Sequence, residues 1–133
     1  MIGVDTNILL RFALQDDDAQ SRSAIAFLRA DERLSSPAMI CPVTLVEFVW
    51  TVRRREGFSK ARVLDLLDAF TDSGRIAYSD EKLIRACIEQ WRSGTADLPD
   101  YLIAALNLQA GARTTVTFDR NAASEIGFTP LPS

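Results

Sequence analysis

Apolar residues are grouped along the chain in two ways, as short continuous runs and as longer stripes with helical spacing. A short run bounded by polar or turn-forming residues predicts a buried strand, and an apolar repeat every three to four residues predicts an amphipathic helix. The predicted strands are residues 2–4, 38–41, 75–78, 114–118 and 128–131. The predicted helices cover residues 6 or 7 to 15, 16–18 onward, 43–55, 60 onward, 80 onward and 98–110, and residues 121–125 form one helical turn.

Capping residues mark the ends of several predicted helices. Thr6 or Asn7 can cap the first helix, and Ser59 and Ser79 can cap two later ones. Gly111 is placed to end the helix at 98–110. Strands that alternate with helices predict an α/β fold with a central, mainly parallel sheet and helices on both faces. We expect one domain over residues 1–133, with ligands outside the carboxyl ends of the strands.

Composition narrows the class of protein. No apolar run is long enough to span a membrane and no secretory signal opens the chain, so we expect a cytoplasmic protein without a membrane partner. A net charge of −3 argues against a protein that coats DNA nonspecifically. Cys41 and Cys87 are expected to be small apolar side chains in a reducing compartment, and not a disulfide.

The chain contains no histidine. This excludes the Ser-His-Asp and Cys-His nucleophile systems and general acid catalysis by histidine. With two cysteines, a zinc site is also disfavoured. Hydrolytic chemistry would therefore depend on carboxylates and a hard cation such as Mg²⁺ or Mn²⁺, which prefer oxygen ligands.

Four acids interrupt apolar sequence and are the main candidates for such a site. Asp5 and Asp119 follow predicted strands, Glu47 lies within a predicted helix, and Asp100 lies near the start of another. A charge among apolar residues needs a partner or a metal. Four carboxylates in one pocket would repel each other, and bound cations would remove that cost. Their convergence is an expectation from the fold, since the four are spread over nearly the whole chain.

The strings around these acids resemble the PIN domains, and among them the VapC ribonuclease toxins of prokaryotic toxin–antitoxin pairs. Val4-Asp5-Thr6-Asn7 is similar to the N-terminal strand and metal-binding acid of the family. Glu47, Asp100 and Asp119 match its later acids, the last within Thr117-Phe118-Asp119-Arg120. The strings occur in order and at the usual spacing over the full length. One mild departure is Leu98-Pro99, where members often carry Phe and a small residue.

The resemblance implies a three-layer α/β/α PIN-like fold and a Mg²⁺- or Mn²⁺-dependent endoribonuclease that cleaves RNA by a metal-activated water. It also implies a toxin, often dimeric, that is inhibited by a small, DNA-binding, VapB-like antitoxin. Asp5, Glu47, Asp100 and Asp119 would be both the metal-binding and the catalytic residues.

Each site residue has a competing structural role. Asp5 could cap the first helix, Glu47 could be a solvated helix residue, and Asp119 could begin a turn, but we favour the metal role for all three. Of Asp97 and Asp100, which share a helical face, one is expected to be a cap, and we assign Asp100 to the metal.

For the other polar residues, more than one role stays open or a structural role is the default. Supporting hydrogen bonds to the carboxylates and plain capping or filling roles remain open for Thr6, Asn7, Thr117 and Asp97. Surface charge is the default role for Arg11, Arg120 and the arginines at 53–55, and Trp50 is expected in a core or interface. Candidate residues for an apolar groove that binds an antitoxin tail are Leu10, Leu14, Phe48 and Val52, with core packing as the alternative role.

Two rival functions remain. A catalytically silent regulatory module could keep the fold and bind a partner, although the complete set of acids argues against it. A metal-dependent phosphatase would usually carry an Asp-x-Asp motif, and Asp5-Thr6-Asn7 lacks the second Asp.

Overall fold

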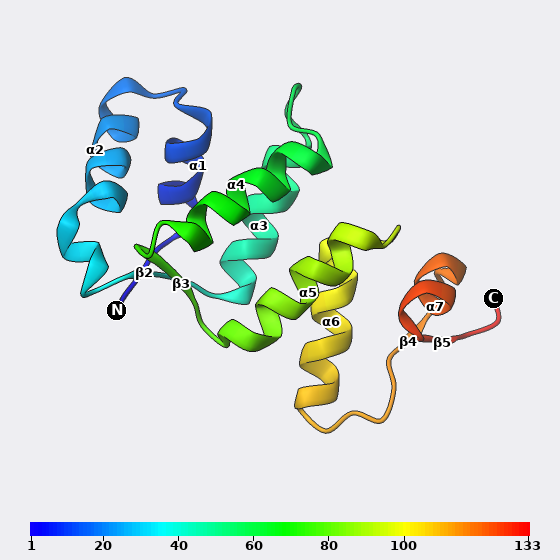
Figure 1. The fold of residues 1–133 in the computed structure, drawn as a ribbon. Coiled ribbons are helices and arrows are strands. Elements are labelled where there is room, and N and C mark those ends of the chain that lie inside the picture. Colours follow the sequence, from blue (N-terminus) through cyan, green and yellow to red (C-terminus); the bar gives the residue numbers. More distant parts are fainter. The chain divides into compact units, whose positions relative to one another are not determined.

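The computed structural model describes residues 1–133, which divide into two compact units, Met1–Glu81 and Lys82–Ser133. Figure 1 shows the order of the elements along the chain. The first unit holds β1 (Ile2–Gly3), α1 (Thr6–Leu14), α2 (Asp18–Arg29), the 3₁₀ helix η1 (Asp31–Leu34), β2 (Ala38–Ile40), α3 (Pro42–Arg53), α4 (Lys60–Asp72) and β3 (Ile76–Tyr78). The second holds α5 (Glu81–Ser93), α6 (Leu98–Gln109), β4 (Val116–Thr117), α7 (Arg120–Ile126) and β5 (Thr129–Pro130).

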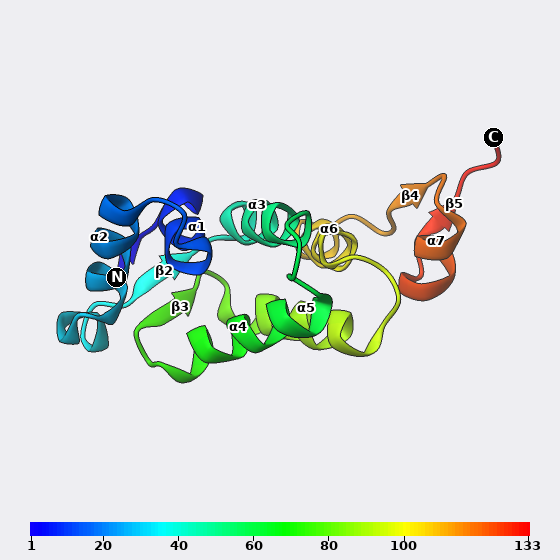
Figure 2. The ribbon, with the colours of Figure 1, turned by 90° about the horizontal axis from the view of Figure 1, so that it is seen from above.

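The first unit is organised by a three-stranded parallel sheet in the order β1-β2-β3. Ile2 pairs with Ala38, and Ala38 pairs with Ile76. Figure 2 shows β2 beside β3. Parallel neighbours require a crossover, which the helices between the strands supply. The carboxyl ends of β1 and β2 therefore lie side by side, and α1 and α3 start from them.

The core of the first unit is built from the apolar stripes of its helices. Phe70 on α4 packs its ring 6.0 Å from that of Phe48 and 5.8 Å from that of Phe12. Phe48 and Val52 on α3 are each 1 % exposed, so they belong to this core. The prediction that these two line a groove for a partner is wrong, because core packing leaves no surface for contact.

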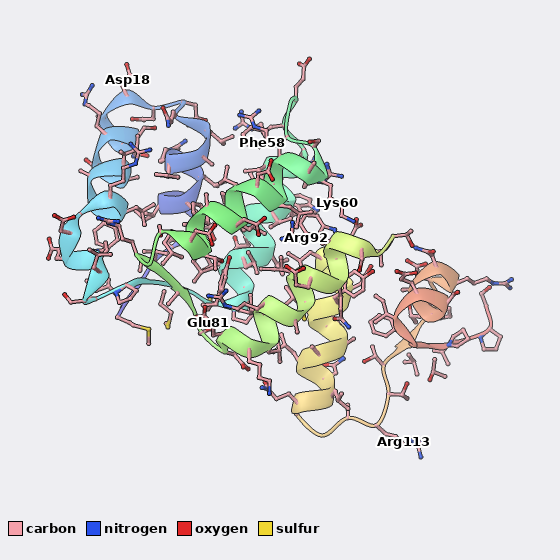
Figure 3. All side chains as sticks on the ribbon, in the orientation of Figure 1. Asp18, Phe58, Lys60, Glu81, Arg92 and Arg113 are labelled. Atoms are coloured by element: carbon pink, nitrogen blue, oxygen red, sulfur yellow. The ribbon has the colours of Figure 1, made fainter.

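The second unit packs α5 and α6 through apolar residues and carries α7 beside them. Ile84, Cys87 and Trp91 form the buried stripe of α5, and the Cys87 thiol lies 3.5 Å from the carbonyl oxygen of Tyr101. Beyond α6, an exposed loop that includes Arg113 (labelled in Figure 3) leads to β4, which pairs in parallel with β5. The strands are thus described in two parallel sheets, one in each unit.

Most helix boundaries follow the sequence signals. Ser59 caps α4 by accepting a hydrogen bond from the Arg62 amide at 3.2 Å, and Gly111 adopts a φ of 100° just beyond α6. The predicted cap of α1 is wrong: Asp5, and not Thr6 or Asn7, occupies that position. Asp80, and not Ser79, directly precedes α5.

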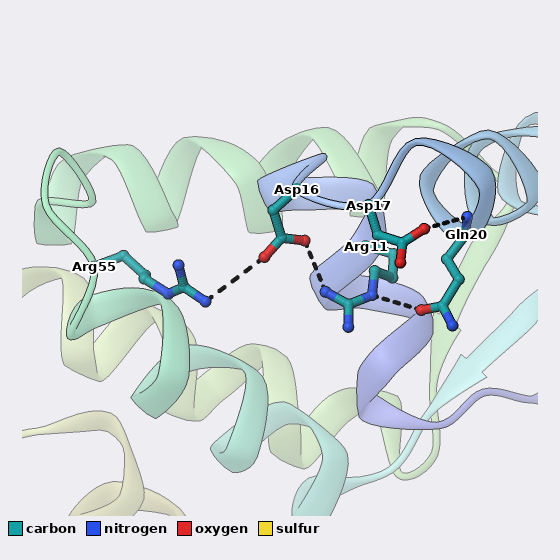
Figure 4. Close-up of polar contacts among 5 residues, drawn as sticks. All are labelled: Arg11, Asp16, Asp17, Gln20 and Arg55. Atoms are coloured by element: carbon teal, nitrogen blue, oxygen red, sulfur yellow. Dashed lines mark hydrogen bonds and ion pairs between the residues drawn. The ribbon is translucent and has the colours of Figure 1, made fainter.

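Charged side chains connect the turn between α1 and α2 to the turn after α3. Arg11 binds Asp16 at 2.7 Å and the Gln20 side chain at 2.7 Å, and Arg55 lies 3.7 Å from the other Asp16 oxygen (Figure 4). Asp17 caps α2 through the Gln20 amide. These turns are thus joined by paired charges within one unit.

Candidate metal-binding site

Asp5 stands where β1 passes into α1. The Val4 amide donates to the Met39 carbonyl at 3.1 Å, which fixes the end of the strand. Asp5 then has an extended backbone and caps α1, and its Oδ1 accepts the Thr6 amide at 2.7 Å. Its Oδ2 has no protein partner, and the side chain is exposed. Capping therefore uses one carboxylate oxygen and leaves the other available to a cation.

Glu47 lies on the middle of α3, which begins with Pro42 at the carboxyl end of β2. Its side chain is exposed, although its sequence neighbours Phe48 and Val49 are buried. The expectation that apolar neighbours make solvation of Glu47 unfavourable is wrong, because on a helix these neighbours point to other faces. The helix α3 packs against α1, so Glu47 and Asp5 are carried by two contacting helices.

Asp97 and Asp100 occupy the N-cap and third positions of α6. Asp97 makes no capping hydrogen bond with its side chain, so its carboxylate is not used for that role. The Asp100 side chain is half-buried. Burial raises the pKa of the Asp100 carboxyl above its ordinary value, the charges of Asp97 and Asp119 raise it further, and hydrogen bonding by the Asp97 backbone offsets part of the rise.

Asp119 caps α7 directly after β4. Its Oδ1 accepts the amides of Asn121 at 2.9 Å and Ala122 at 3.2 Å, while Oδ2 has no protein partner. The Thr117 hydroxyl accepts the Asp119 amide at 3.0 Å. Thr117 therefore orients the backbone of Asp119, and a hydrogen bond from Thr117 to a carboxylate stays a prediction.

Thr6 and Asn7, which were also predicted to support the carboxylates, form no side-chain hydrogen bond with Asp5. Thr6 is 6 % exposed and its hydroxyl oxygen has no hydrogen-bond partner. Asn7 is exposed on the first turn of α1. No hydrogen bond joins either side chain to Asp5, so their predicted support of the carboxylates stays a prediction.

The acids fall into two sets. Asp5 and Glu47 belong to the first unit, and Asp97, Asp100 and Asp119 to the second, where their charges influence one another. Within either unit, no three acidic side chains converge closely enough to form a metal site. Convergence of Asp5, Glu47, Asp100 and Asp119 spans both units and stays a prediction.

The donor set nevertheless fits a hard cation. All its members are carboxylates, and two of them, Asp5 and Asp119, cap helices with Oδ1 alone. None of the five acids forms an ion pair with Lys or Arg, whereas Asp16 and Asp31 do. Half-buried Asp100 lies among like charges without a cation. A divalent cation would remove this repulsion and would bind through oxygen, as Mg²⁺ and Mn²⁺ prefer.

The three arginines at residues 53–55 make contacts with other groups of the protein and not with the candidate acids. Arg53 donates to the Phe58 carbonyl at 3.1 Å, Arg54 stacks 4.3 Å from the Trp50 ring centroid, and Arg55 pairs with Asp16. These contacts agree with structural charge at residues 53–55. Trp50 is 57 % exposed and is not part of a core.

Sequence reasoning missed one group of contacts beside Asp100. Glu125 on α7 accepts hydrogen bonds from the Thr95 amide and the Tyr101 hydroxyl, both at 3.2 Å. Tyr101 follows Asp100 directly, and Gly94 lies against both side chains. No motif marks these residues, because the contacts join positions 24 and 30 residues apart.

A family model matches nearly the whole chain. A search of curated proteins returns no match to the chain. The family model described as PIN domain matches residues 2–128, which include every acid of the candidate site. Together with seven α-helices and parallel strand pairing, this match confirms the predicted three-layer α/β/α fold class. The chain belongs to the PIN domain family.

Proposed function

We propose that this protein is a Mg²⁺- or Mn²⁺-dependent endoribonuclease and the toxin of a VapBC-type toxin–antitoxin pair. PIN domains are typically nucleases that act on RNA or other nucleic acids and generally use divalent metals, so membership supports the coarser part of this statement. The observation that carries the finer part is the set of unpaired carboxylates at the starts of α1, α6 and α7.

In the proposed mechanism the acids first bind and orient. Asp5 and Asp100 are the most direct ligands, with Glu47 and Asp119 completing the pocket. A bound divalent cation supplies activation of water and neutralisation of phosphate charge. The caps at Asp5 and Asp119 hold each Oδ1 in place, which fixes the direction of the free Oδ2. Thr117 adds to this by holding the Asp119 backbone.

Substitution of Asp5 tests the site. Asp5→Asn keeps an oxygen that can cap α1 and removes the charge that would bind metal, so RNA cleavage should be lost while unfolding stays cooperative. Asp65→Asn is the matched control, since Asp65 is an exposed acid of α4. Wild-type cleavage by Asp5→Asn in Mg²⁺ would refute the assignment.

The rival functions give different results in the same assay. A silent regulatory module cleaves no RNA with or without a chelator, and a phosphatase releases phosphate from a monoester but leaves internal RNA linkages intact. Loss of endonucleolytic cleavage on chelation, with recovery in Mn²⁺, supports the proposal. A single domain over residues 1–133, a cytoplasmic location and a homodimer belong to the same proposal. No helix combines the length and apolar character needed to cross a bilayer.

The toxin part of the proposal requires an inhibitor. The unpaired acids favour a cationic plug, so an antitoxin tail would place an Arg near Asp5 and Asp100, where its planar fork can engage two carboxylate oxygens. Leu10 and Leu14 on α1 are half-buried and remain candidates for apolar contact. The gene of such an antitoxin is expected to be adjacent to that of this chain. Co-expression with a small protein encoded there should yield a complex without nuclease activity, and binding without inhibition would refute the plug.

A further inference from the structure

Glu125 connects the far end of α7 to the loop that precedes α6. Its Oε1 accepts hydrogen bonds from the Thr95 amide and from the Tyr101 hydroxyl, each at 3.2 Å. Thr95 belongs to the short segment between α5 and α6, and Tyr101 is a buried residue of the first turns of α6. One carboxylate oxygen therefore joins three parts of the second unit.

The backbone at Gly94 closes around these contacts. A Cβ at Gly94 would overlap the Tyr101 hydroxyl and would come within 2.6 Å of Glu125 Oε1 and 2.8 Å of the Gln90 carbonyl oxygen. Glycine is thus required here for close approach and not for its backbone dihedral angles. We call Gly94, Thr95, Tyr101 and Glu125 the Glu125 cluster. Its packing leaves little freedom for α7 to slide along α6.

The same short helix carries Asp119 at its other end. Asp119 is the N-cap of α7 and Glu125 lies in its last turn, so a shift of Glu125 moves Asp119 with it. Asp97 and Asp100 adjoin the two donors of this contact, since Asp97 lies two residues beyond Thr95 and Asp100 directly precedes Tyr101. The Glu125 cluster therefore fixes the segments that hold three of the candidate acids.

In metal-free protein, the like charges of Asp100 and Asp119 oppose the close approach of α6 and α7, and another contact must offset this repulsion. The helices α6 and α7 pack against each other, and Asp100 and Asp119 lie at their amino-terminal ends. Repulsion between the two acids favours separation of α7 from the start of α6, and neither acid has a Lys or Arg partner to oppose it. The hydrogen bonds of Glu125 oppose that separation.

We propose that Glu125 is a positioning residue that holds Asp119 beside Asp100, so that the two carboxylates are ready to bind a divalent cation. This inference rests on the proposed metal-dependent nuclease. In this role Glu125 acts through its hydrogen bonds with Thr95 and Tyr101.

Two substitutions at Glu125 separate its hydrogen bonds from its charge. Glu125→Gln keeps an oxygen acceptor for the Thr95 amide and the Tyr101 hydroxyl, whereas Glu125→Ala removes it. Glu89→Ala is the control for loss of an acid, because Glu89 is exposed on α5 and pairs only with Arg92 of its own helix. The full-length protein is titrated with Mn²⁺, and binding is followed by water-proton relaxation.

Glu125→Ala should weaken Mn²⁺ binding roughly tenfold, the range expected for loss of a residue that orients metal ligands. Glu125→Gln and Glu89→Ala should bind Mn²⁺ like the wild type. In metal-free protein, the amides of Asn121 and Ala122, which are held by Asp119, should exchange faster in Glu125→Ala and not in Glu125→Gln. Unchanged affinity and exchange in Glu125→Ala would overturn the inference.

The experiment also separates failure of the inference from failure of the proposed function. If the wild type neither binds Mn²⁺ nor cleaves RNA, the proposed function fails and the inference fails with it. If the wild type does both and Glu125→Ala matches it, only the positioning role fails. Tyr101→Phe keeps the buried ring and removes one donor to Glu125, so it provides the test if Glu125→Ala does not fold. Its Mn²⁺ affinity should fall in the same direction, and wild-type affinity would count against the inference.

Discussion

Two groups of acids in this protein differ in whether arginine side chains neutralise their charge. Asp16, in the turn between α1 and α2, lies between two arginines, Arg11 at 2.7 Å and Arg55 at 3.7 Å (Figure 4). At the start of α6, Asp97 and Asp100 lie near Asp119 with no arginine or lysine paired to any of them. The first arrangement neutralises charge within the fold, and the second leaves it for something that binds.

The contrast separates structural acids from candidate functional ones better than sequence context does. Glu47 lies in an apolar string and is exposed, whereas Asp16 lies in a string of acids and is paired. The candidate ligands Asp5 and Asp119 combine an Oδ2 without a protein partner with a position just beyond a strand, whereas Asp17, which also caps a helix through Oδ1, follows a helix. The predictions below test whether that difference has consequences for activity and stability.

The largest expected effect is on catalysis. Asp100→Asn removes the half-buried charge at the centre of the unpaired group. Since residues that only orient metal ligands are worth 10- to 100-fold, loss of a direct ligand should reduce the RNA cleavage rate by at least about 100-fold. Single-turnover cleavage of a labelled RNA in Mg²⁺ measures this, with Asp16→Asn as the paired-acid control. Equal losses in both variants would mean that pairing does not identify the site.

The next effect is on stability in the presence of metal. A cation that binds only the folded protein raises the free energy of unfolding, by about 1.4 kcal/mol at ten times its Kd. Thermal unfolding of the wild type should therefore shift upward with Mg²⁺ or Mn²⁺, and that of Asp100→Asn should shift less. A melting temperature of the wild type that is indifferent to millimolar metal would contradict a shared pocket.

A smaller effect concerns pH in metal-free protein. The pKa of the Asp100 carboxyl is raised in the folded state, first by burial and then by Asp97 and Asp119. The folded state therefore holds this proton more tightly than the unfolded chain, so the favourable contribution of Asp100 is complete below its ordinary pKa of 3.8 and is lost as pH rises through the raised folded value.

Asp100→Asn should accordingly be more stable than the wild type at neutral pH and lose this advantage at low pH. Urea unfolding at several pH values measures the difference. An advantage that grows on acidification would have the wrong sign and would place the cause elsewhere.

The fold was largely predictable because its signals are local. The apolar stripe of α4, its cap at Ser59 and the terminating Gly111 of α6 follow from helix periodicity and backbone preferences. Parallel pairing followed from alternation of strands and helices. The cap of α1 was misassigned because Asp, Thr and Asn stand in succession at residues 5–7 and all can cap a helix.

The sequence predicts which acids are candidates for the site, but it does not predict the contacts that each of them makes. Asp97 could be matched to the N-cap of α6 from sequence, but the absence of its side-chain capping bond could not. The exposure of Glu47 depends on the face of α3 that packs inward, and the contacts of Glu125 join positions far apart in sequence. Such contacts depend on tertiary packing, which short motifs do not contain.

The smallest expected effect belongs to the paired group. Asp16 is about one-third exposed, and its contacts with Arg11 and Arg55 are surface ion pairs, which typically contribute up to about 1 kcal/mol. Asp16→Asn should lower the free energy of unfolding by that amount or less, and the loss should shrink in high salt because the charges are screened. The opposite sign is expected for Asp100→Asn at neutral pH without metal. Removing the paired charge of Asp16 takes a carboxylate partner from Arg11 and Arg55, whereas removing the unpaired charge of Asp100 relieves repulsion. Urea unfolding of both variants in one buffer shows whether each substitution raises or lowers the free energy of unfolding. If Asp16→Asn stabilises the protein as Asp100→Asn does, the net negative charge of the chain governs both variants, and the difference between the two groups of acids has no energetic basis.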